Sequence, residues 1–110
     1  MADRIPTFEA FWPYYVDQHR LPANRALHFV GTTGTILNAL AAVLTLNPVL
    51  LLSAAGCGYF FAWIGHFGVE KNRPATFTYP LWSLRADFCM YGLMLTRRMG
   101  PEIARLQKAA

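Results

Sequence analysis

The chain has 110 residues, which is enough for one domain. Of these residues 55% are hydrophobic and 15% are charged, and this composition is too apolar for an ordinary soluble domain of this size. Residues 26–69 contain no Lys, Arg, Asp or Glu, and this stretch can hold two membrane helices of about 20 residues each. The net charge of +4 comes from basic residues that flank apolar segments, which favours contacts with lipid head groups and argues against nucleic-acid binding.

The chain begins with an aromatic-rich segment and continues into the first predicted spanning helix. The segment around Pro13 contains Phe8, Phe11, Trp12, Tyr14 and Tyr15, which is typical of anchoring at a membrane surface. Pro13 predicts a kink or two short helical pieces. The first spanning helix is predicted over residues 23–45, because Pro22 suits a first helical turn. Its small or polar residues share one face: His28, Gly31, Thr32, Thr35, Ala39 and Ala42.

A second spanning helix is predicted over residues 49–70, after the turn signal Asn47-Pro48. Small and ionisable residues recur there at every fourth position: Ala54, Gly58, Ala62, His66 and Glu70. Such seams let membrane helices approach closely, so the two small-residue faces should pack together. His28 and His66 are nearly equidistant from the turn. A tight hairpin therefore places them close together at the membrane–water boundary.

A connector with two prolines, residues 71–80, precedes a third helix predicted over residues 81–99. It is either an interfacial amphipathic helix or a short helix packed beside the hairpin, and Gly100-Pro101 is expected to end it. The predicted fold is therefore all-α, one membrane domain over residues 1–110 with flanking interfacial helices. Lys and Arg flank the hairpin at both ends and are missing from its turn, so both termini should be cytoplasmic, in a bacterial inner membrane or the endoplasmic reticulum.

The chemistry of the chain centres on its three histidines, His19, His28 and His66. With Glu70 or Asp87 they form a donor set suited to non-haem iron, zinc or manganese. Each histidine could instead serve only as a hydrogen-bonding residue, and Glu70 could form a surface pair with Arg73.

The other polar residues near this level have two interpretations each. Asn24 could cap the first spanning helix or hold a histidine in one tautomer. Arg25, Arg73 and Arg85 could bind an acidic head group or a substrate carboxylate, or could simply be the basic residues that set membrane orientation.

Two sequence blocks, HRLPANRALHFVG from His19 and WIGHFGVEKNRPA from Trp63, resemble the signature blocks of the 2-hydroxy fatty acid dioxygenase family. The resemblance implies a membrane enzyme that uses Fe(2+) and O2 to shorten a 2-hydroxy fatty acid by one carbon. By motif, His19, His28 and His66 match the family's histidines, while Asn24, Glu70 and Lys71 match its polar positions. Longer members have a glutamine near the position of Ala62 and additional membrane segments, which this chain lacks.

From these observations we predict a metal site of His19, His28 and His66, with catalytic roles for Asn24 and Glu70. We predict that Arg73, Arg25 or Arg85 binds the substrate carboxylate. Two non-enzymatic alternatives remain at this point. One is a haem-binding hairpin that uses His28 and His66 as axial ligands. The other is a hairpin that only organises lipid. The sequence leaves the oligomeric state open, a homo-oligomer included.

Overall fold

The computed structural model describes residues 4–109, and within this range it contains helices and connecting loops but no strand. The predicted all-α fold is therefore confirmed. The helices in chain order are α1 (Phe8–Asp17), α2 (Pro22–Thr45), α3 (Val49–Trp63), the π-helix η1 (Ile64–Glu70), the 3-10 helix η2 (Ala75–Phe77), α4 (Pro80–Leu95) and α5 (Met99–Ala109).

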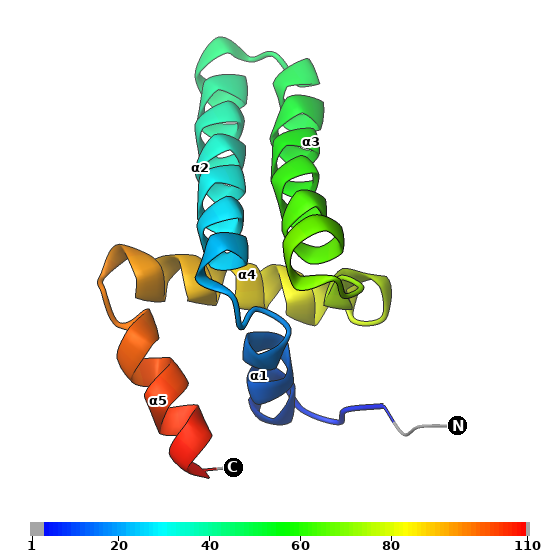
Figure 1. The fold of residues 1–110 in the computed structure, drawn as a ribbon. Coiled ribbons are helices and arrows are strands. Elements are labelled where there is room, and N and C mark those ends of the chain that lie inside the picture. The colour runs from blue at the N-terminus through cyan, green and yellow to red at the C-terminus, as the bar shows by residue number, and fades with distance from the viewer. Residues whose placement is uncertain (1–3, 110) are drawn as a thin grey trace.

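The two long helices α2 and α3 form a hairpin and lie side by side along their length (Figure 1). At the turn Leu46 adopts a left-handed conformation with φ of 55°. The amide oxygen of Asn47 accepts a hydrogen bond from the Val49 backbone N–H. The helices approach closely, because a Cβ atom built on Gly31 would lie 3.2 Å from the Gly58 carbonyl oxygen. The small residues on the facing surfaces thus allow the close packing that the sequence predicts.

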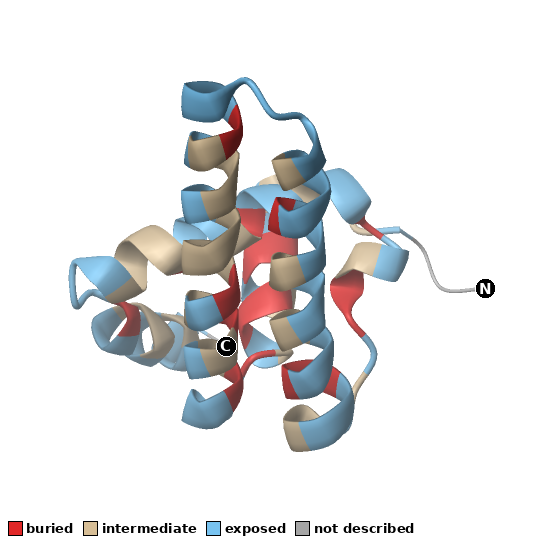
Figure 2. Ribbon diagram, turned by 90° about the horizontal axis from the view of Figure 1, so that it is seen from above, coloured by how far each residue is buried: buried red, intermediate tan, exposed pale blue. Residues whose placement is uncertain are grey.

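The outer surface of the hairpin is apolar and exposed (Figure 2). In the most apolar 18-residue stretch of each long helix only 17% is buried, whereas the core helix of a soluble protein would be mostly buried. The exposed side chains include Leu37, Leu40, Val43, Leu44, Leu52 and Phe60. Both helices are long and apolar enough to cross a membrane, so the hairpin could span one.

The hydrophobic core lies at the other end of the molecule, where α1, α4 and α5 pack together. Helix α4 runs across the base of the hairpin, and α1 and α5 lie beyond it, away from the turn (Figure 1). Phe11 of α1 and Ala86 of α4 are completely buried in this core. Helix α1 is continuous through Pro13, so the alternative of two short helical pieces is wrong. Pro13 is exposed and the Thr7 side chain caps the helix by accepting from the Ala10 N–H.

The C-terminal part differs from the sequence prediction of one helix over residues 81–99. Helix α4 ends at Leu95, and a turn follows in which Arg97 adopts a left-handed conformation with φ of 60°. Gly100 and Pro101 lie in the first turn of α5 instead of ending the preceding helix. Proline is tolerated there, because the first backbone N–H groups of a helix have no partner within the helix.

Candidate metal centre

Three buried histidine rings meet at the base of the hairpin. His19 follows α1, His28 lies in the second turn of α2, and His66 lies in η1. The ring centroids of His19 lie 4.5 Å from those of both His28 and His66, and the latter two are 4.8 Å apart. One nitrogen of each ring lies within 4.8 Å of the others. The predicted proximity of His28 and His66 is therefore confirmed, and His19 completes a triangle.

The π-helix η1 brings His66 into this triangle. Its wider turns follow directly on the α-helical part of the second long helix. It ends where Lys71 adopts a left-handed conformation with φ of 61°. The Asn72 N–H then donates to the His66 carbonyl oxygen at 2.9 Å, so the chain folds back under the histidine. Single π-helical turns of this kind occur frequently at functional sites.

The Nδ1 atoms of two histidines are held by hydrogen bonds that fix the tautomer. Nδ1 of His19 lies 2.7 Å from the carbonyl oxygen of Tyr15, which can only accept, so Nδ1 carries the proton. Nδ1 of His66 lies 2.7 Å from Oδ1 of Asn72. The amide of Asn72 is oriented by its Nδ2, which donates to the Gln18 carbonyl oxygen. Nε2 of both rings is then left with a free lone pair.

The inner nitrogens have no protein partner. Nε2 of His19 and Nε2 of His28 are both buried and make no hydrogen bond. Buried polar atoms in this state call for an explanation, and a metal ion supplies one. Burial lowers the pKa of His19 well below its usual value, and the neighbouring rings of His28 and His66 lower it further. His19 is therefore neutral, as a metal ligand must be. A set of three imidazoles fits iron(II) and zinc.

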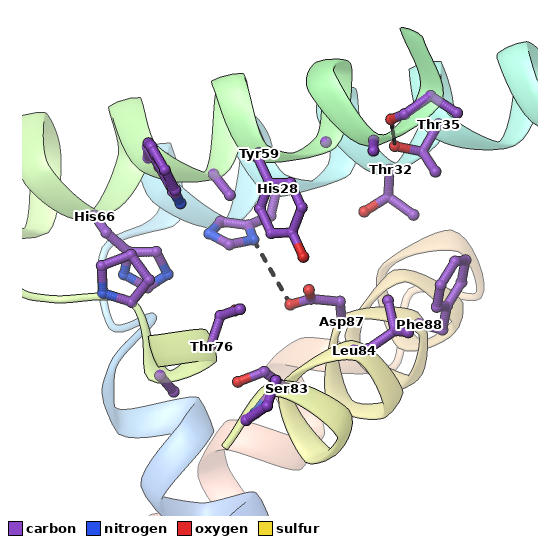
Figure 3. Close-up of a pocket in the computed structure, with 18 of the residues that line it drawn as sticks. His28, Thr32, Thr35, Tyr59, His66, Thr76, Ser83, Leu84, Asp87 and Phe88 are labelled. Carbon is purple, nitrogen blue, oxygen red and sulfur yellow. Dashed lines mark hydrogen bonds and ion pairs between the residues drawn. The ribbon is translucent and has the colours of Figure 1, made fainter. Parts of the chain in front are cut away.

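A carboxylate lies beside the third histidine. Oδ1 of Asp87 in α4 is 3.9 Å from Nδ1 of His28 (Figure 3). The Tyr15 hydroxyl donates a hydrogen bond to the same oxygen. Burial raises the pKa of Asp87 to about 6, although the Tyr15 hydrogen bond acts in the opposite direction. The Tyr15 ring also stacks on His19 with centroids 4.1 Å apart. Tyr15 and Asp87 thus connect α1 and α4 to the histidine triangle.

A cavity of about 350 Å³ opens from the histidines and extends along the hairpin toward Ala39 and Leu51. Near the histidines its wall is polar, and the side chains of Thr32, Tyr59, Thr76, Ser83 and Asp87 contribute to it (Figure 3). Farther along the hairpin the wall is formed by Ala39, Leu51, Ala54, Ala55 and Gly58, together with Thr35, whose hydroxyl donates to the Ala54 carbonyl oxygen. The cavity thus has a polar end at the histidines and an apolar end, which suits a molecule with a polar head and an apolar tail.

The structure places the two predicted catalytic residues against the backbone of the site. Asn24 is completely buried one helical turn before His28, and neither its amide oxygen nor its nitrogen has a partner. A Cβ atom on Gly65 would lie 1.8 Å from the Asn24 amide oxygen, so Asn24 fills the space that the glycine leaves. Glu70 accepts a hydrogen bond from the Leu21 N–H at 2.6 Å and ties the end of η1 to the start of α2.

None of the three predicted arginines lines the cavity. Arg25 donates to the carbonyl oxygens of His19 and Arg20. The Arg85 guanidinium lies 4.0 Å from the ring centroid of Phe8, on the α1 side of α4. The Arg73 guanidinium lies 4.9 Å from the ring centroid of Phe77, and Arg73 directly precedes the cavity-lining residues 74–76. Arg73 and Arg85 each adjoin a cavity-lining residue along the chain, Pro74 and Leu84, but the Arg85 guanidinium is directed to Phe8.

The comparison with protein families shows to which family the chain belongs. A model of the 2-hydroxy-palmitic acid dioxygenase Mpo1-like family matches residues 5–99. The chain belongs to this family. The matched region includes the three histidines together with Tyr15, Asn72 and Asp87. Searches of curated proteins and of solved structures found no match.

The contacts of Tyr15 and Asn72 were not predicted from the sequence. The aromatic-rich segment predicts only a membrane-surface role for Tyr15, whereas its carbonyl oxygen accepts from His19 four residues later, in the turn that follows α1. Asn72 lies in the connector, where no periodic pattern indicates its direction. Asp87 was included among the possible carboxylates, but only the path of α4 across the hairpin brings it to His28.

Proposed function

We propose that this protein is an iron(II)-dependent membrane dioxygenase that acts in the α-oxidation of 2-hydroxy fatty acids and shortens the chain by one carbon. The observation that carries the proposal is the convergence of three buried histidines, with the buried inner nitrogens of His19 and His28 lacking protein partners. Family membership supports the reaction class. Atoms balance when the 2-hydroxy acid and O2 yield the shortened acid, CO2 and water, so no other reductant is required.

His19, His28 and His66 would hold the iron. When bound, iron(II) supplies electrons for the activation of O2. The protein orients the rings of His19 and His66 through their outer nitrogens, with Tyr15 and Asn72 as partners. With His19, His28 and His66 as its protein ligands, the iron would still be open to O2 and the substrate.

The shape and polarity of the cavity support a fatty-acid substrate. The eleven-residue step from His28 to Ala39 corresponds to about 16 Å along α2, so the cavity as a whole has the length for a long acyl chain. The 2-hydroxy acid group then lies beside the histidines and Asp87. The apolar wall is formed by the small residues of the hairpin, and Phe60 and Phe67 lie outside it.

We assign Asn24 and Glu70 as positioning residues within this proposal. The Glu70 carboxylate accepts a hydrogen bond from the Leu21 N–H, and this contact fixes the short loop between His19 and the start of α2. Asn24 packs against Gly65 and so sets the spacing between α2 and the segment that carries His66. Arg73 is proposed to bind the substrate carboxylate at the mouth of the cavity, since Arg25 and Arg85 are occupied elsewhere.

The hairpin is proposed to span the membrane with both termini on the cytoplasmic side. Residues 26–69 carry no charge, and all Lys and Arg residues lie toward the two ends of the chain. Single cysteines at Asn47 and Gln107, in a variant without Cys57 and Cys89, test this orientation with an impermeant thiol reagent. The residue-107 cysteine should react from the cytoplasmic side and the residue-47 cysteine from the opposite side. Equal reaction of both from the cytoplasmic side would overturn the proposal.

The haem alternative is disfavoured by the position of His19. Axial ligands to a haem lie on opposite faces of a wide planar macrocycle. The ring of His19 is 4.5 Å from both His28 and His66, so it occupies the space that such a plane between them would need. A visible spectrum distinguishes the two cases, because haem gives a strong Soret band and a site of three histidines with iron(II) does not.

The test is metal analysis and oxygen uptake after anaerobic purification. Wild-type protein should retain iron and consume O2 with a 2-hydroxy fatty acid but not with the corresponding acid that lacks the hydroxyl group. His28→Ala and His66→Ala should lose most of the iron and the activity. Thr45→Ala, at the far end of the hairpin, is the matched control and should retain both. If both histidine variants fold and keep their full iron content, these residues are not ligands.

A further inference from the structure

Helix α4 carries an unpartnered apolar stripe. Leu81, Leu84, Phe88 and Leu95 recur at steps of three, four and seven, so they share one helical face. All four side chains are exposed, Leu81 by 78%. A continuous row of large exposed apolar side chains on one helix marks an interaction surface.

The direction of the stripe is fixed by Tyr91, which lies on the same helical face. The Tyr91 ring stacks on Phe29 of α2 with centroids 4.7 Å apart, and its hydroxyl lies 2.9 Å from Oγ1 of Thr33. This face of α4 is therefore turned toward the hairpin. The opposite face carries Ala86 and Met90, which are buried in the core with α1 and α5. The stripe thus faces the same side as the exposed apolar surface of α2 and α3.

The cations of α4, α5 and the turn between them lie on the other side of α4 from the hairpin. Residues 26–70 contain no Lys or Arg, and α5 and the adjoining turn carry Arg97, Arg98, Arg105 and Lys108. The single cation in α4, Arg85, turns toward Phe8 of α1. The apolar face of α4 is turned toward a hairpin that is long enough to span a membrane, and the cations lie on the opposite side of α4. This arrangement is typical of a helix that lies at a membrane surface, with its apolar face against the acyl chains and its cations near the lipid head groups.

The cavity opens on this same apolar surface. Tyr59 and Trp63 of α3 and Leu84 and Phe88 of α4 line the cavity, and each is between 44% and 54% exposed. The rim between α3 and α4 is thus formed by large side chains that belong to both the cavity wall and the outer surface. Figure 3 shows Tyr59 of α3 and Leu84 and Phe88 of α4 among the side chains that line the cavity. Such a rim favours an apolar molecule that arrives from the bilayer over a solute that arrives from water.

We propose that α4 lies in the plane of the membrane surface with its stripe against the acyl chains, and that the opening between α3 and α4 is a lateral portal for a single-chain lipid acid. The occupant of the stripe is the bilayer, because the stripe is continuous with the apolar surface of the hairpin. The portal rests on the proposed function, since it assumes an acyl substrate at the histidines. The position of α4 does not depend on that function.

The position of α4 is tested with a fluorescent label in phospholipid vesicles. One protein carries the label at Leu81→Cys without Cys57 and Cys89. The matched control carries it at the native Cys89, which lies on another face of the same helix, in a Cys57→Ala background. The label at residue 81 should be quenched by phospholipids with a spin label near the head of the acyl chain and be shielded from aqueous iodide. The label at residue 89 should show the reverse.

Two results would overturn this position. Equal iodide quenching at residues 81 and 89 would show that the stripe faces water. Shielding of residue 81 from both quenchers would show that a second protein copy covers the stripe.

The portal is tested by photo-crosslinking, whose readout needs no turnover. A 2-hydroxy fatty acid with a diazirine in its acyl chain is illuminated in the same vesicles, and the modified peptides are mapped. Crosslinks should concentrate on residues 59–63 and 84–88, and Phe88→Glu should reduce them several-fold while Cys89→Glu leaves them unchanged. Crosslinks confined to the outer face of α2 would overturn the portal. Absence of oxygen uptake with correct crosslinks would overturn the proposed reaction alone.

Discussion

Oδ1 of Asp87 lies 3.9 Å from Nδ1 of His28, across 59 positions of sequence, and also accepts the hydrogen bond of the Tyr15 hydroxyl. The carboxylate therefore faces the one histidine of the triangle whose outer nitrogen has no closer partner. In metal sites a carboxylate in this place orients the ring and increases its basicity. Asp87 thus connects the core helix α4 to the proposed metal site on the hairpin.

Replacement of Asp87 by Asn should weaken metal binding by about 10–100-fold without unfolding the protein, because the ring of His28 loses its orienting carboxylate. Metal titration of the apo protein measures the affinity, and the absorption spectrum of the cobalt-substituted protein reports the ligand geometry. Tyr15→Phe should have a smaller effect in the same direction. Asp17→Asn, an exposed carboxylate in α1, is the control. Unchanged metal affinity in Asp87→Asn would contradict an orienting role.

Replacement of Gly65 by Ala should destabilise the protein by about 1–3 kcal/mol, because the new methyl group would meet the Asn24 amide oxygen at 1.8 Å. The double variant Asn24→Ala with Gly65→Ala removes the obstructing amide and should recover part of the loss. Gly68→Ala is a matched control in the same π-helix, since no atom lies within 4 Å of its added Cβ. Thermal unfolding of the three variants in detergent measures these differences. Equal destabilisation by both single glycine variants would contradict the proposed packing.

Glu102 should make the core of α1, α4 and α5 sensitive to acid. Its carboxylate accepts hydrogen bonds from Arg105 and from Nε1 of Trp12. These contacts lower the pKa of Glu102 from 4.5 to about 2, and the hydrogen bond from Arg105 has the largest effect. A carboxylate with a lowered pKa stabilises the fold above its unfolded-state pKa, and this contribution is lost as the pH falls. The loss should therefore occur between about pH 4.5 and about pH 2.

The measurement for Glu102 is the thermal unfolding of wild type and Glu102→Gln as a function of pH. Wild type should be the more stable at neutral pH, and the difference should shrink as the pH falls through this window. Glu9→Gln, an exposed carboxyl in α1, is the control and should follow the wild type. A difference between wild type and Glu102→Gln that stays constant with pH would contradict the prediction.

The hairpin and the proximity of His28 and His66 could be predicted because they depend on periodic patterns within two adjacent helices. The charge-free stretch sets the helix lengths, Asn47-Pro48 sets the turn, and the small-residue seam sets the facing surfaces. These features are local, and the two histidines follow from counting residues to the turn. No comparable pattern fixes His19, whose position depends on the hydrogen bond to Tyr15 and the stack of α1 on α4.

The remainder of the site depends on tertiary packing that the sequence does not display. A π-helix has no residue preference strong enough to predict it, so the change of helix type at Ile64 was missed. The break between α4 and α5 depends on a left-handed Arg97, a conformation that arginine rarely adopts. Gly100-Pro101 looked like a helix end, but a proline in the first turn is equally consistent with a helix start.

The substrate carboxylate requires a cation near the mouth of the cavity, and Arg73 is the proposed partner. Its guanidinium rests on Phe77, whose ring lies 5.7 Å from that of Trp63 on the cavity rim. Arg73→Gln should raise the KM for 2-hydroxy acids, because the substrate loses charge-assisted hydrogen bonds that contribute about 1.5–3 kcal/mol to its binding free energy. The iron content should stay unchanged. Arg73→Lys should recover only part of the loss, because lysine lacks the planar fork that binds both carboxylate oxygens. Arg85→Gln and Arg25→Gln are the control variants. Arg85 contacts Phe8 and Arg25 donates to backbone carbonyl oxygens, so their replacement should leave KM nearly unchanged. Wild-type turnover of all three Gln variants across a full substrate titration would show that no arginine holds the carboxylate.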